Sequence, residues 1–224
     1  MTAGARVHWQ GVYQLKAEGQ TSWYRPRLDE SLRLIAAHSP DCDGPALDVG
    51  GGRSTLVDDL LEAGYCDVSV LDVSGEALEQ SRARLATSRN ADAAASVHWI
   101  ESDILGAGLP QSRYALWHDR AVFHFLVDDS EQVAYVALAE CALRPGGVAI
   151  IATFALDGPE RCSGLPVQRY DAPSLAARFG KAFELVASSR EVHAAPNGAS
   201  QAFTYVVLRR VETLPEPRAA HATL

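Results

Sequence analysis

The sequence has few cysteines, and they do not cluster. Its four cysteines among 224 residues show no CxxC spacing, and no group of histidines and cysteines has the spacing of zinc ligands. We therefore expect reduced thiols and no metal. The chain also lacks a run of about 18 apolar residues that could span a bilayer, and its first ten residues lack the apolar centre of a signal peptide. These absences predict a cytoplasmic protein with no membrane partner.

Basic residues are outnumbered. The 20 Lys and Arg against 28 Asp and Glu give a net charge of -8, which argues against general binding to nucleic acid. The content of hydrophobic residues, 47%, is enough for the core of one domain. Composition does not distinguish a monomer from a homodimer, so both remain open.

Apolar runs alternate with amphipathic ones from residue 45 onward. The pattern predicts strands at 45–50, 67–74, 96–104, 113–120 and 148–154, and helices at 54–64, 74–86 and 130–143. The "RPGG" sequence at 144–147 predicts a turn before the fifth strand. Strands that alternate with helices of this length are typical of a parallel sheet with helices on both faces.

The pattern changes near the end of the chain. A helix is expected at 172–180, followed by strands at 183–193 and 201–210 that flank the turn signal "PNG" and form an antiparallel hairpin. We thus predict a doubly wound α/β fold, with a mostly parallel seven-stranded sheet whose last strand is antiparallel. Residues 1–44 should form an N-terminal helical cap or lid, 45–211 the main domain, and 212–224 a disordered tail.

A run of three glycines, 50–52, follows the first expected strand and its Asp48. Glycine permits positive φ and a close approach of the backbone to a ligand, and the next helix begins with unpaired N–H groups. Asp72 ends the second strand, 22 positions after Gly50, where its carboxylate can accept hydrogen bonds from both hydroxyls of a ribose. At the end of the third strand, Asp103 can bind an adenine amino group and Ile104 can cover the ring.

The residues around the glycines separate two kinds of cofactor. A dinucleotide site follows GxGxxG, but Thr55 occupies the last position of that spacing. Asp48 would also repel a pyrophosphate, whereas it would attract an ammonium or sulfonium group. This combination favours S-adenosylmethionine, which carries a ribose, an adenine and positive charge but no phosphate.

The stretch "DVGGGRS" at 48–54 resembles the first motif of class I S-adenosylmethionine-dependent methyltransferases, an acid-x-Gly-x-Gly-x-Gly sequence in which Ser54 here replaces the last glycine. The resemblance covers about Ala46 to Arg210 and implies S-adenosylmethionine as cofactor and S-adenosylhomocysteine as product. The N-terminal "HWQGVY…SWY" is similar to segments in two branches, one acting on small thiol- or halide-type acceptors and the other on protein lysines. In both branches an aromatic residue of this segment covers the cofactor. The cofactor-binding residues expected from the motifs and the resemblance together are Trp23, Tyr24, Asp48, Gly50, Gly51, Gly52, Ser54, Asp72, Val73, Asp103, Ile104 and Asp119.

The acceptor is expected beside the fourth strand, which ends in "LWHDRAVFHFL", and beside the loop at 155–171. A histidine there can take a proton from the acceptor, or it can instead be a hydrogen-bonded brace, because in-line methyl transfer mainly requires alignment and exclusion of water. The predicted catalytic residues are His118, Asp119, His124 and Tyr170. The predicted substrate-binding residues are Arg120, Phe123 and Arg169.

These observations predict methyl transfer to a small molecule, such as a thiol or another small nucleophile. The absence of an appended recognition domain and the aromatic N-terminal segment favour an enclosed pocket for a small ligand. Two alternatives remain open: a protein lysine methyltransferase, which needs an open channel to its lysine, and a non-catalytic protein that binds S-adenosylmethionine or a nucleotide.

Overall fold

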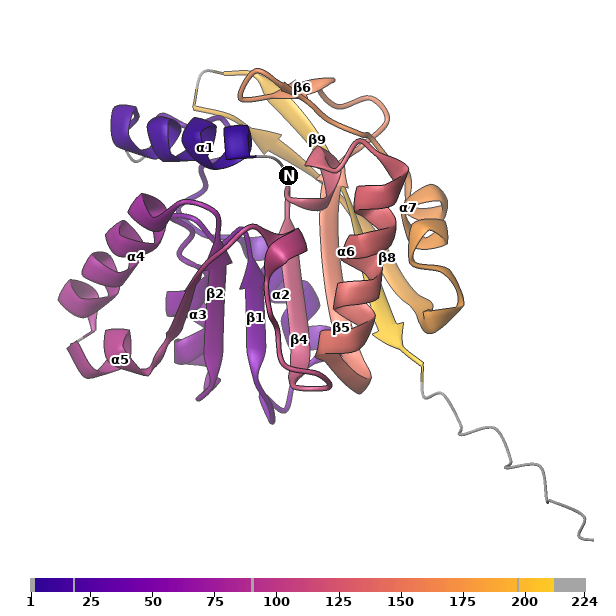
Figure 1. Ribbon diagram of the computed structural model, residues 1–224, viewed down its shortest axis with the longest axis horizontal. Coiled ribbons are helices and arrows are strands. Elements are labelled where there is room, and N and C mark those ends of the chain that lie inside the picture. The colour runs from indigo at the N-terminus through magenta and orange to yellow at the C-terminus, as the bar shows by residue number, and fades with distance from the viewer. Residues whose placement is uncertain (1–2, 18, 90, 197, 212–224) are drawn as a thin grey trace, which may run out of the picture.

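The computed structural model describes residues 3–17, 19–89, 91–196 and 198–211, so the predicted tail at 212–224 lies outside the described residues (Figure 1). The helices are α1 (Ala3–Leu15), α2 (Asp29–His38), α3 (Leu56–Ala63), α4 (Gly75–Ser88), α5 (Ala91–Ser96), α6 (Asp129–Ala142) and α7 (Ala172–Phe179), with single 3-10 turns η1 (Ile104–Gly106), η2 (Phe123–Phe125) and η3 (Gly180–Ala182). The strands are β1 (Ala46–Val49), β2 (Val68–Asp72), β3 (His98–Glu101), β4 (Tyr114–Arg120), β5 (Leu143–Phe154), β6 (Arg161–Cys162), β7 (Leu165–Pro166), β8 (Phe183–Ala194) and β9 (Ser200–Arg210).

Seven strands form one sheet in the order β3-β2-β1-β4-β5-β9-β8. The pairs from β3 to β5 are parallel, whereas β9 runs antiparallel to both β5 and β8. The predicted mostly parallel sheet with an antiparallel last strand is therefore confirmed. Because the chain leaves β1 in one direction for β2 and β3 and returns on the other side at β4, the carboxyl ends of β1 and β4 border the crevice where such sheets bind ligands.

Both faces of the sheet are covered by helices, as the alternation predicted. Side chains such as Val70, Leu116 and Ile150 pack on one face against α2, α3 and α4. Side chains one position along, such as Leu71, Trp117 and Ile151, pack on the other face against α6 and α7. Burial on both faces explains why these strands are continuously apolar rather than alternating.

Two segments differ from the predicted elements. The "RPGG" sequence at 144–147 is part of β5, which begins at Leu143, rather than a turn before it. The pairing of β5 with β4 is irregular here, with a register shift between Tyr114 and Leu116, and Gly146 has φ +76°. The "RPGG" residues therefore form an irregular part of a strand instead of the predicted turn. The loop at 155–171 contains the hairpin β6–β7, whose two-residue strands are too short to produce a periodic pattern.

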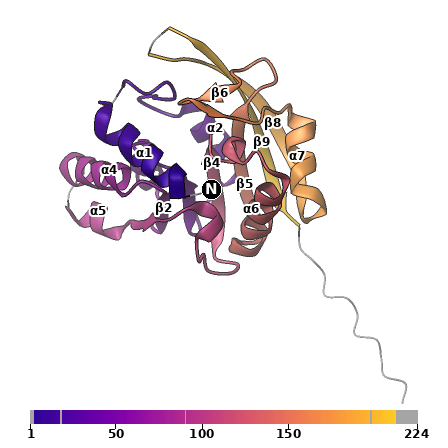
Figure 2. The ribbon, with the colours of Figure 1, turned by 45° about the horizontal axis from the view of Figure 1, so that its top comes forward.

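The helix α1 lies across the carboxyl ends of β1 and β2 and alongside α4 (Figures 1 and 2). Gln10 Oε1 accepts hydrogen bonds from Ser74 Oγ at 2.9 Å and Glu76 N at 3.4 Å, at the start of α4. Arg53 Nη1 donates to Lys16 O at 2.9 Å, and Arg6 pairs with Glu101. These contacts place the N-terminal helix over the end of the sheet where the glycine turn lies.

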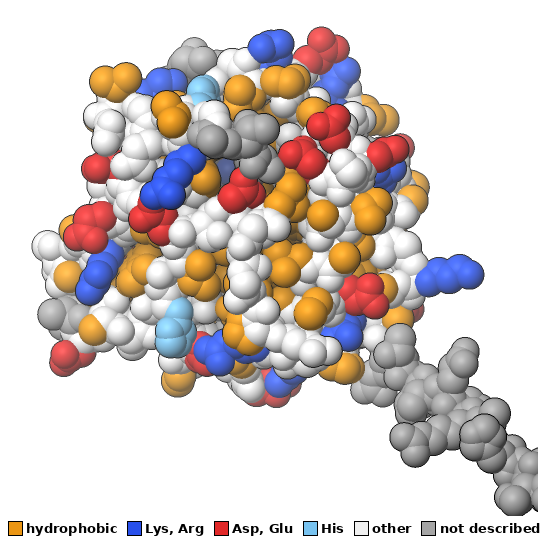
Figure 3. Space-filling model, viewed as in Figure 1, with side chains coloured by type: hydrophobic (Ala, Val, Ile, Leu, Met, Phe, Trp, Pro, Cys, Tyr) orange, Lys and Arg blue, Asp and Glu red, His pale blue; other side chains and the backbone are white. Residues whose placement is uncertain are grey.

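The surface seen in Figure 3 mixes acidic and basic side chains, with no large basic area on this face. No helix among the described residues combines the length and the apolar character that crossing a membrane requires.

Candidate active site

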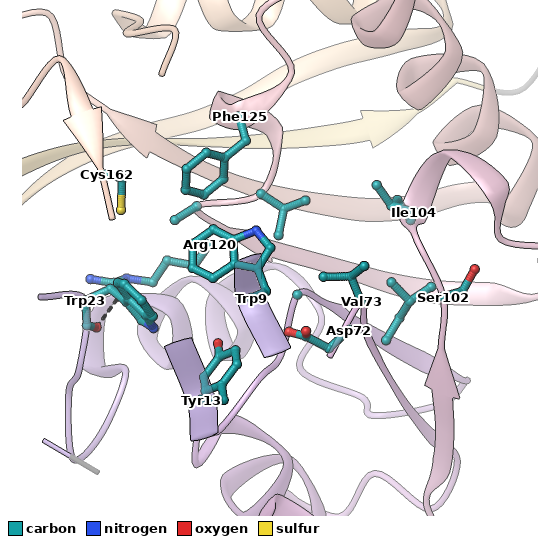
Figure 4. A pocket seen from close by; sticks show the side chains of 14 residues that line it. Trp9, Tyr13, Trp23, Asp72, Val73, Ser102, Ile104, Arg120, Phe125 and Cys162 are labelled. Atoms are coloured by element: carbon teal, nitrogen blue, oxygen red, sulfur yellow. Dashed lines mark hydrogen bonds between the residues drawn. The ribbon is translucent and has the colours of Figure 1, made fainter. Parts of the chain in front are cut away.

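Two adjoining cavities open at the carboxyl ends of β1, β2 and β4. Counted with the solvent space that opens onto them, their volumes are about 610 Å³ and about 560 Å³. Tyr13, Trp23, Gly50 and Arg120 line both, so the cavities form one cleft with two lobes. The first lobe continues toward β2 and β3, and the second continues toward the turn after β1. Figure 4 shows side chains of the first lobe.

The glycine turn lies between the two lobes and is crowded by the protein itself. A Cβ on Gly50 would lie 2.1 Å from Val122 Cγ2, and one on Gly52 would lie 2.4 Å from the Tyr13 hydroxyl oxygen. Gly50 and Gly52 also have φ of +66° and +51°. The bare backbone therefore serves close packing against neighbouring segments, in addition to any approach to a ligand.

Asp48 is buried near the end of β1 and is fixed by His118 on β4. His118 Nδ1 lies 2.8 Å from Asp48 Oδ1, and its Nε2 lies 2.9 Å from Ser31 Oγ on α2. Only 1% of His118 is exposed, although it borders the second lobe. Both ring nitrogens are engaged, which supports the bracing alternative for His118 over the role of a base. Its catalytic role remains a prediction.

Asp72, at the end of β2, borders the first lobe. Its Oδ1 accepts a hydrogen bond from Ser74 N at 2.8 Å. Burial raises the pKa of Asp72 to about 7, although the amides of Ser74 and Gly52 act in the opposite direction. The buried Tyr13 hydroxyl lies beside Asp72, and burial together with the charge of Asp72 raises the pKa of Tyr13. Asp72 is thus a buried acid that faces the cleft and that the nearby protein groups stabilise only in part.

The third expected acid, Asp103, lies two positions after the end of β3. Its Oδ1 accepts a hydrogen bond from Leu105 N at 3.0 Å and so caps η1. Ile104, Val73 and Ser102 line the first lobe, opposite the aromatic side chains in Figure 4. The structure thus brings Asp72, Val73 and Ile104 together on one side of the cleft, while Asp103 does not border it.

Asp119 is fully buried and turned toward the protein interior. Its oxygens accept hydrogen bonds from Val122 N at 2.8 Å, Phe123 N at 3.0 Å and the Tyr135 hydroxyl at 2.5 Å. Burial raises the pKa of Asp119 to about 6. Asp119 does not border the cleft, and its oxygens hold η2 and α6 in place, so its contacts are those of a structural acid. No contact of Asp119 supports the predicted catalytic and cofactor-binding roles.

Three other predicted residues pack in the interior. Phe123 is fully buried and its ring centroid lies 5.0 Å from that of Tyr135 and 5.8 Å from that of Tyr170. His124 is fully buried against Phe154, and burial lowers its pKa to about 3, so the ring is neutral. None of Phe123, His124 and Tyr170 borders either lobe. Phe123 and His124 follow β4 and pack toward α6 and β5, and Tyr170, just before α7, packs against Phe123.

Of the two arginines expected around the acceptor, Arg120 reaches the cleft and Arg169 does not. The side chain of Arg120 is 6% exposed and borders both lobes. Arg169 instead pairs with Glu160 at 3.0 Å and donates to Gly158 O at 3.1 Å. Arg161 donates to Gly164 O in the β6–β7 hairpin. These last two arginines stabilise the loop at 155–171 and do not line the cleft.

Aromatic side chains form one wall of the first lobe (Figure 4). We refer to Trp9, Tyr13, Trp23 and Phe125 as the aromatic wall. The ring centroid of Trp9 lies 5.5 Å from that of Trp23 and 5.2 Å from that of Phe125, in edge-to-face geometry. Tyr24, the other predicted covering residue, borders the second lobe. Both aromatics of "SWY" therefore lie at the cleft: Trp23 borders both lobes and Tyr24 borders the second.

The segment that carries Trp23 is attached to the C-terminal hairpin. Arg25 Nη2 lies 3.1 Å from Glu191 Oε1 on β8, and Arg120 Nη1 donates to Trp23 O at 3.3 Å. His193 Nε2 lies 2.8 Å from Ser22 O, and burial lowers the pKa of His193. When the neutral His193 ring donates a hydrogen bond from Nε2 to Ser22 O, its Nδ1 can accept one from Arg25 Nη1, which lies 3.5 Å away.

Several cleft residues were not selected from the sequence. Trp9 and Tyr13 are spaced four apart, which places them on one face of α1 and would have indicated a shared wall. Arg25 and Arg53 flank the second lobe, and neither has a sequence signal beyond its charge. The remaining additions, known from the structure alone, are Thr21, Leu28, Val49, Leu71, Ser102, Ala121, Val122, Phe125 and Cys162.

No group of three or more histidines, cysteines, aspartates and glutamates within the described ranges is arranged to hold a metal ion. Cys162 borders the first lobe, and burial raises its pKa to about 12, so the thiol is protonated. The cleft therefore offers carboxylates, arginines and aromatic rings to a ligand.

Comparison with known proteins identifies the type of domain that contains the glycine turn, Asp72 and Arg120. Residues 46–147, from β1 into β5, match the family model described as a methyltransferase domain. No curated protein sequence is similar to the chain.

Solved structures resemble the whole chain. One is the 1,6-didemethyltoxoflavin-N1-methyltransferase of Burkholderia thailandensis with bound 1,6-didemethyltoxoflavin and S-adenosylhomocysteine: 22% identity, 94% of this chain and 88% of that chain covered, TM-score 0.73. Another is the N-methyltransferase NodS of Bradyrhizobium japonicum with S-adenosylhomocysteine: 14% identity, 92% and 99% covered, TM-score 0.68. A third, described by the conversion of a disulfide bond into a thioacetal group during echinomycin biosynthesis, has 18% identity, 92% coverage of both chains and TM-score 0.69. The domain match and these folds agree with the motif "DVGGGRS", so the predicted methyltransferase and its cofactor, S-adenosylmethionine, are confirmed.

Proposed function

The chain carries a class I S-adenosylmethionine-dependent methyltransferase domain, and from that premise we propose that the enzyme methylates a small molecule bound in the first lobe. The observation that carries the proposal is the single cleft, which joins the glycine turn and Asp72 to the aromatic wall.

The residues at the cleft fit the cofactor. Asp72 is a buried carboxylate with one oxygen held by Ser74 N, and burial raises its pKa to about 7 although the amides of Ser74, Gly52 and Val73 act in the opposite direction. Two ribose hydroxyls would supply further donors to this carboxylate. Val73 and Ile104 offer apolar surface for an adenine beside Asp72, and Asp48 contributes negative charge near the second lobe. Gly50, Gly51, Gly52 and Ser54 form the turn between these groups, and Tyr24 also lines the second lobe.

When bound, S-adenosylmethionine supplies a methyl group on a positively charged sulfur. The residues of the chain then act by holding and shielding the two reactants, since in-line transfer depends on alignment and on exclusion of water. The aromatic wall covers the cleft, and its one hydroxyl, on Tyr13, is a weak nucleophile because burial raises its pKa and keeps it protonated. His118, whose two nitrogens bind Asp48 and Ser31, keeps the Asp48 carboxylate in position. We therefore propose no general base for the reaction.

A small acceptor is favoured over a protein lysine because the aromatic wall and the segment attached to β8 cover the cleft. Trp9 and Tyr13 are 8% and 7% exposed, so little of this wall is open to a large partner. Among the similar structures, the Burkholderia enzyme contains a small heterocyclic ligand, 1,6-didemethyltoxoflavin. The same covering argues for a small acceptor here.

The first experiment measures binding of S-adenosylmethionine and S-adenosylhomocysteine to the full chain by calorimetry. We expect one site for each. The second incubates the enzyme with S-adenosylmethionine and a panel of small thiols, phenols, amines and carboxylates beside a lysine-rich protein, and detects S-adenosylhomocysteine by mass spectrometry. Product with a small acceptor only is expected. Product with the lysine-rich protein only would overturn the proposed acceptor, and cofactor binding without product in every case would favour a non-catalytic binding protein.

A further inference from the structure

We propose that the acceptor is a planar aromatic or heteroaromatic molecule with an anionic group, whose ring lies against the aromatic wall and whose anion is bound by Arg120. The inference rests on the proposed function, since it assigns the chemistry of the acceptor in the same cleft. It depends on the direction in which Arg120 extends, on its incomplete set of partners, and on the composition of the wall.

Arg120 borders both lobes, but its guanidinium contacts the side of the cleft opposite Asp72, the acid expected to bind the ribose. It is the last residue of β4, but its Nε donates to the Tyr205 hydroxyl at 3.1 Å and its guanidinium carbon lies 4.3 Å from the centroid of the Phe203 ring. Tyr205 and Phe203 belong to β9, beyond β5. Asp72 is the last residue of β2, on the opposite side of β1. Arg120 therefore presents its charge on the β5 and β9 side of the cleft, away from Asp72.

The guanidinium of Arg120 has capacity for another acceptor atom. Its Nη2 is buried, lies 3.9 Å from Glu191 Oε2 and has no hydrogen-bond partner among the described residues. Glu191 is already paired with Arg25 at 3.1 Å and accepts from the Tyr205 hydroxyl at 3.0 Å. The cluster of Arg25, Arg120 and Glu191 contains two cations and one anion. A buried donor and an excess positive charge together favour an anionic ligand.

The aromatic wall lies beside Arg120 in the same lobe (Figure 4). Trp9, Trp23 and Phe125 contribute three large rings, and the Cys162 thiol, protonated because burial raises its pKa to about 12, adds another apolar side chain. Flat rings gain from edge-to-face and offset contacts with such side chains beyond the burial of apolar area. A saturated ligand of the same size gains only the burial. The aromatic wall thus favours a planar ligand, and Arg120 favours a ligand with a negative charge.

A competing assignment gives Arg120 to the carboxylate of the cofactor's amino-acid portion. Arg25 and Arg53 line the second lobe beside Ser54 and offer that carboxylate two other guanidinium groups, although Arg25 pairs with Glu191 and Arg53 donates to Lys16 O. The two assignments make opposite statements about Arg120. If Arg120 holds the acceptor, its loss leaves the affinity for S-adenosylhomocysteine unchanged; if it holds the cofactor, that affinity falls.

The test is calorimetry on the full chain saturated with S-adenosylhomocysteine, using three probes: 2-naphthoate, 2-naphthamide and cyclohexanecarboxylate. We expect 2-naphthoate to bind about tenfold more tightly than either of the others, because charge-assisted hydrogen bonds are stronger than neutral ones and flat rings pack on the wall. Arg120→Gln should remove the preference for naphthoate over naphthamide, and Arg120→Lys should retain part of it. Phe125→Leu should reduce the preference for naphthoate over cyclohexanecarboxylate.

Arg144→Gln is the matched control, since this arginine pairs with Asp43 at 2.8 Å and lies in β5 at the opposite end of the sheet. It should bind all three probes like the unaltered chain. Equal binding of the three probes, or a drop in S-adenosylhomocysteine affinity in Arg120→Gln with the naphthoate preference intact, would overturn the inference. A chain that fails to bind S-adenosylhomocysteine at all would instead refute the proposed function. The affinity of each variant for S-adenosylhomocysteine also reports whether it is folded.

Discussion

Asp72 and Asp119 are two buried acids near the carboxyl ends of β2 and β4, the strands on either side of β1, yet they face different surroundings. Burial raises the pKa of both, to about 7 and about 6. Asp119 accepts three hydrogen bonds from Val122 N, Phe123 N and the Tyr135 hydroxyl, all inside the protein. Asp72 accepts a hydrogen bond from Ser74 N, lies near the amides of Gly52 and Val73, and borders the cleft. Burial and a raised pKa therefore do not distinguish a ligand-binding acid from a structural one, whereas contact of the side chain with the cleft does.

The largest effect is expected from Asp119→Ala. This change leaves two backbone amides and a buried hydroxyl without their acceptor, so we expect the free energy of unfolding to fall by about 3–5 kcal/mol. Chemical denaturation measures the difference. A loss below about 1 kcal/mol would show that these donors find other partners and that Asp119 is not the structural acid of the pair.

Asp72→Ala should act on the ligand instead. Loss of the ribose acceptor should weaken the binding of S-adenosylhomocysteine by about 1–3 kcal/mol, measured by calorimetry. The matched control is Asp67→Ala, which lies just before the amino end of β2 and pairs with Arg113 at 2.9 Å, far from the cleft. An affinity equal to that of the control would place the ribose elsewhere and remove the distinction between the two acids.

The pH dependence sharpens the comparison further. Asp72 is protonated below its pKa of about 7, and the ribose hydroxyls prefer the ionised form. The affinity for S-adenosylhomocysteine should therefore be constant above pH 7 and fall as the pH decreases, by at most about tenfold per pH unit. Calorimetry across this range gives the profile. Asp72→Asn should bind weakly with a flat profile over the same range, and a sloping profile in this variant would assign the titration to another group.

The smallest effect is expected from Tyr135→Phe. Asp119 loses one of its three donors, and Trp117 Nε1 loses an acceptor at 2.9 Å, so unfolding should become easier by about 1–2 kcal/mol. The affinity for S-adenosylhomocysteine should not change, because neither side chain borders the cleft. A change in affinity without a change in stability would connect Asp119 to the ligand site after all.

The sequence was informative wherever one local rule decided the structure. Alternating periods predicted the doubly wound sheet, and the spacing from Gly50 to Asp72 predicted that both would lie at one cleft. Local rules failed where several applied at once. The end of β4 contains His118, Asp119 and Arg120 in succession, and the sequence assigned all three to the site. The strand directs His118 toward Asp48, Asp119 toward α6 and Arg120 across β5, and only the packing of the neighbouring elements separates these environments.

Contacts between distant segments were beyond sequence reasoning for a related reason. Arg25 and Glu191 are ordinary charged residues with no motif, and they meet only because the segment after α1 passes over the C-terminal hairpin. The same holds for the hydrogen bond between His193 and Ser22. Such pairs depend on the closed tertiary structure rather than on any local pattern.

That attachment has a consequence for the order in which the enzyme becomes complete during synthesis. Helix α1, with Trp9 and Tyr13, is held by residues that are synthesised soon after it, such as Ser74 and Glu76. The following segment differs, because Ser22 and Arg25 contact His193 and Glu191 on β8, which emerge much later. A nascent chain that ends before β8 therefore contains the glycine turn, Asp72 and the partners of α1, but it lacks these partners of Ser22 and Arg25, so this part of the cover reaches its full set of contacts last.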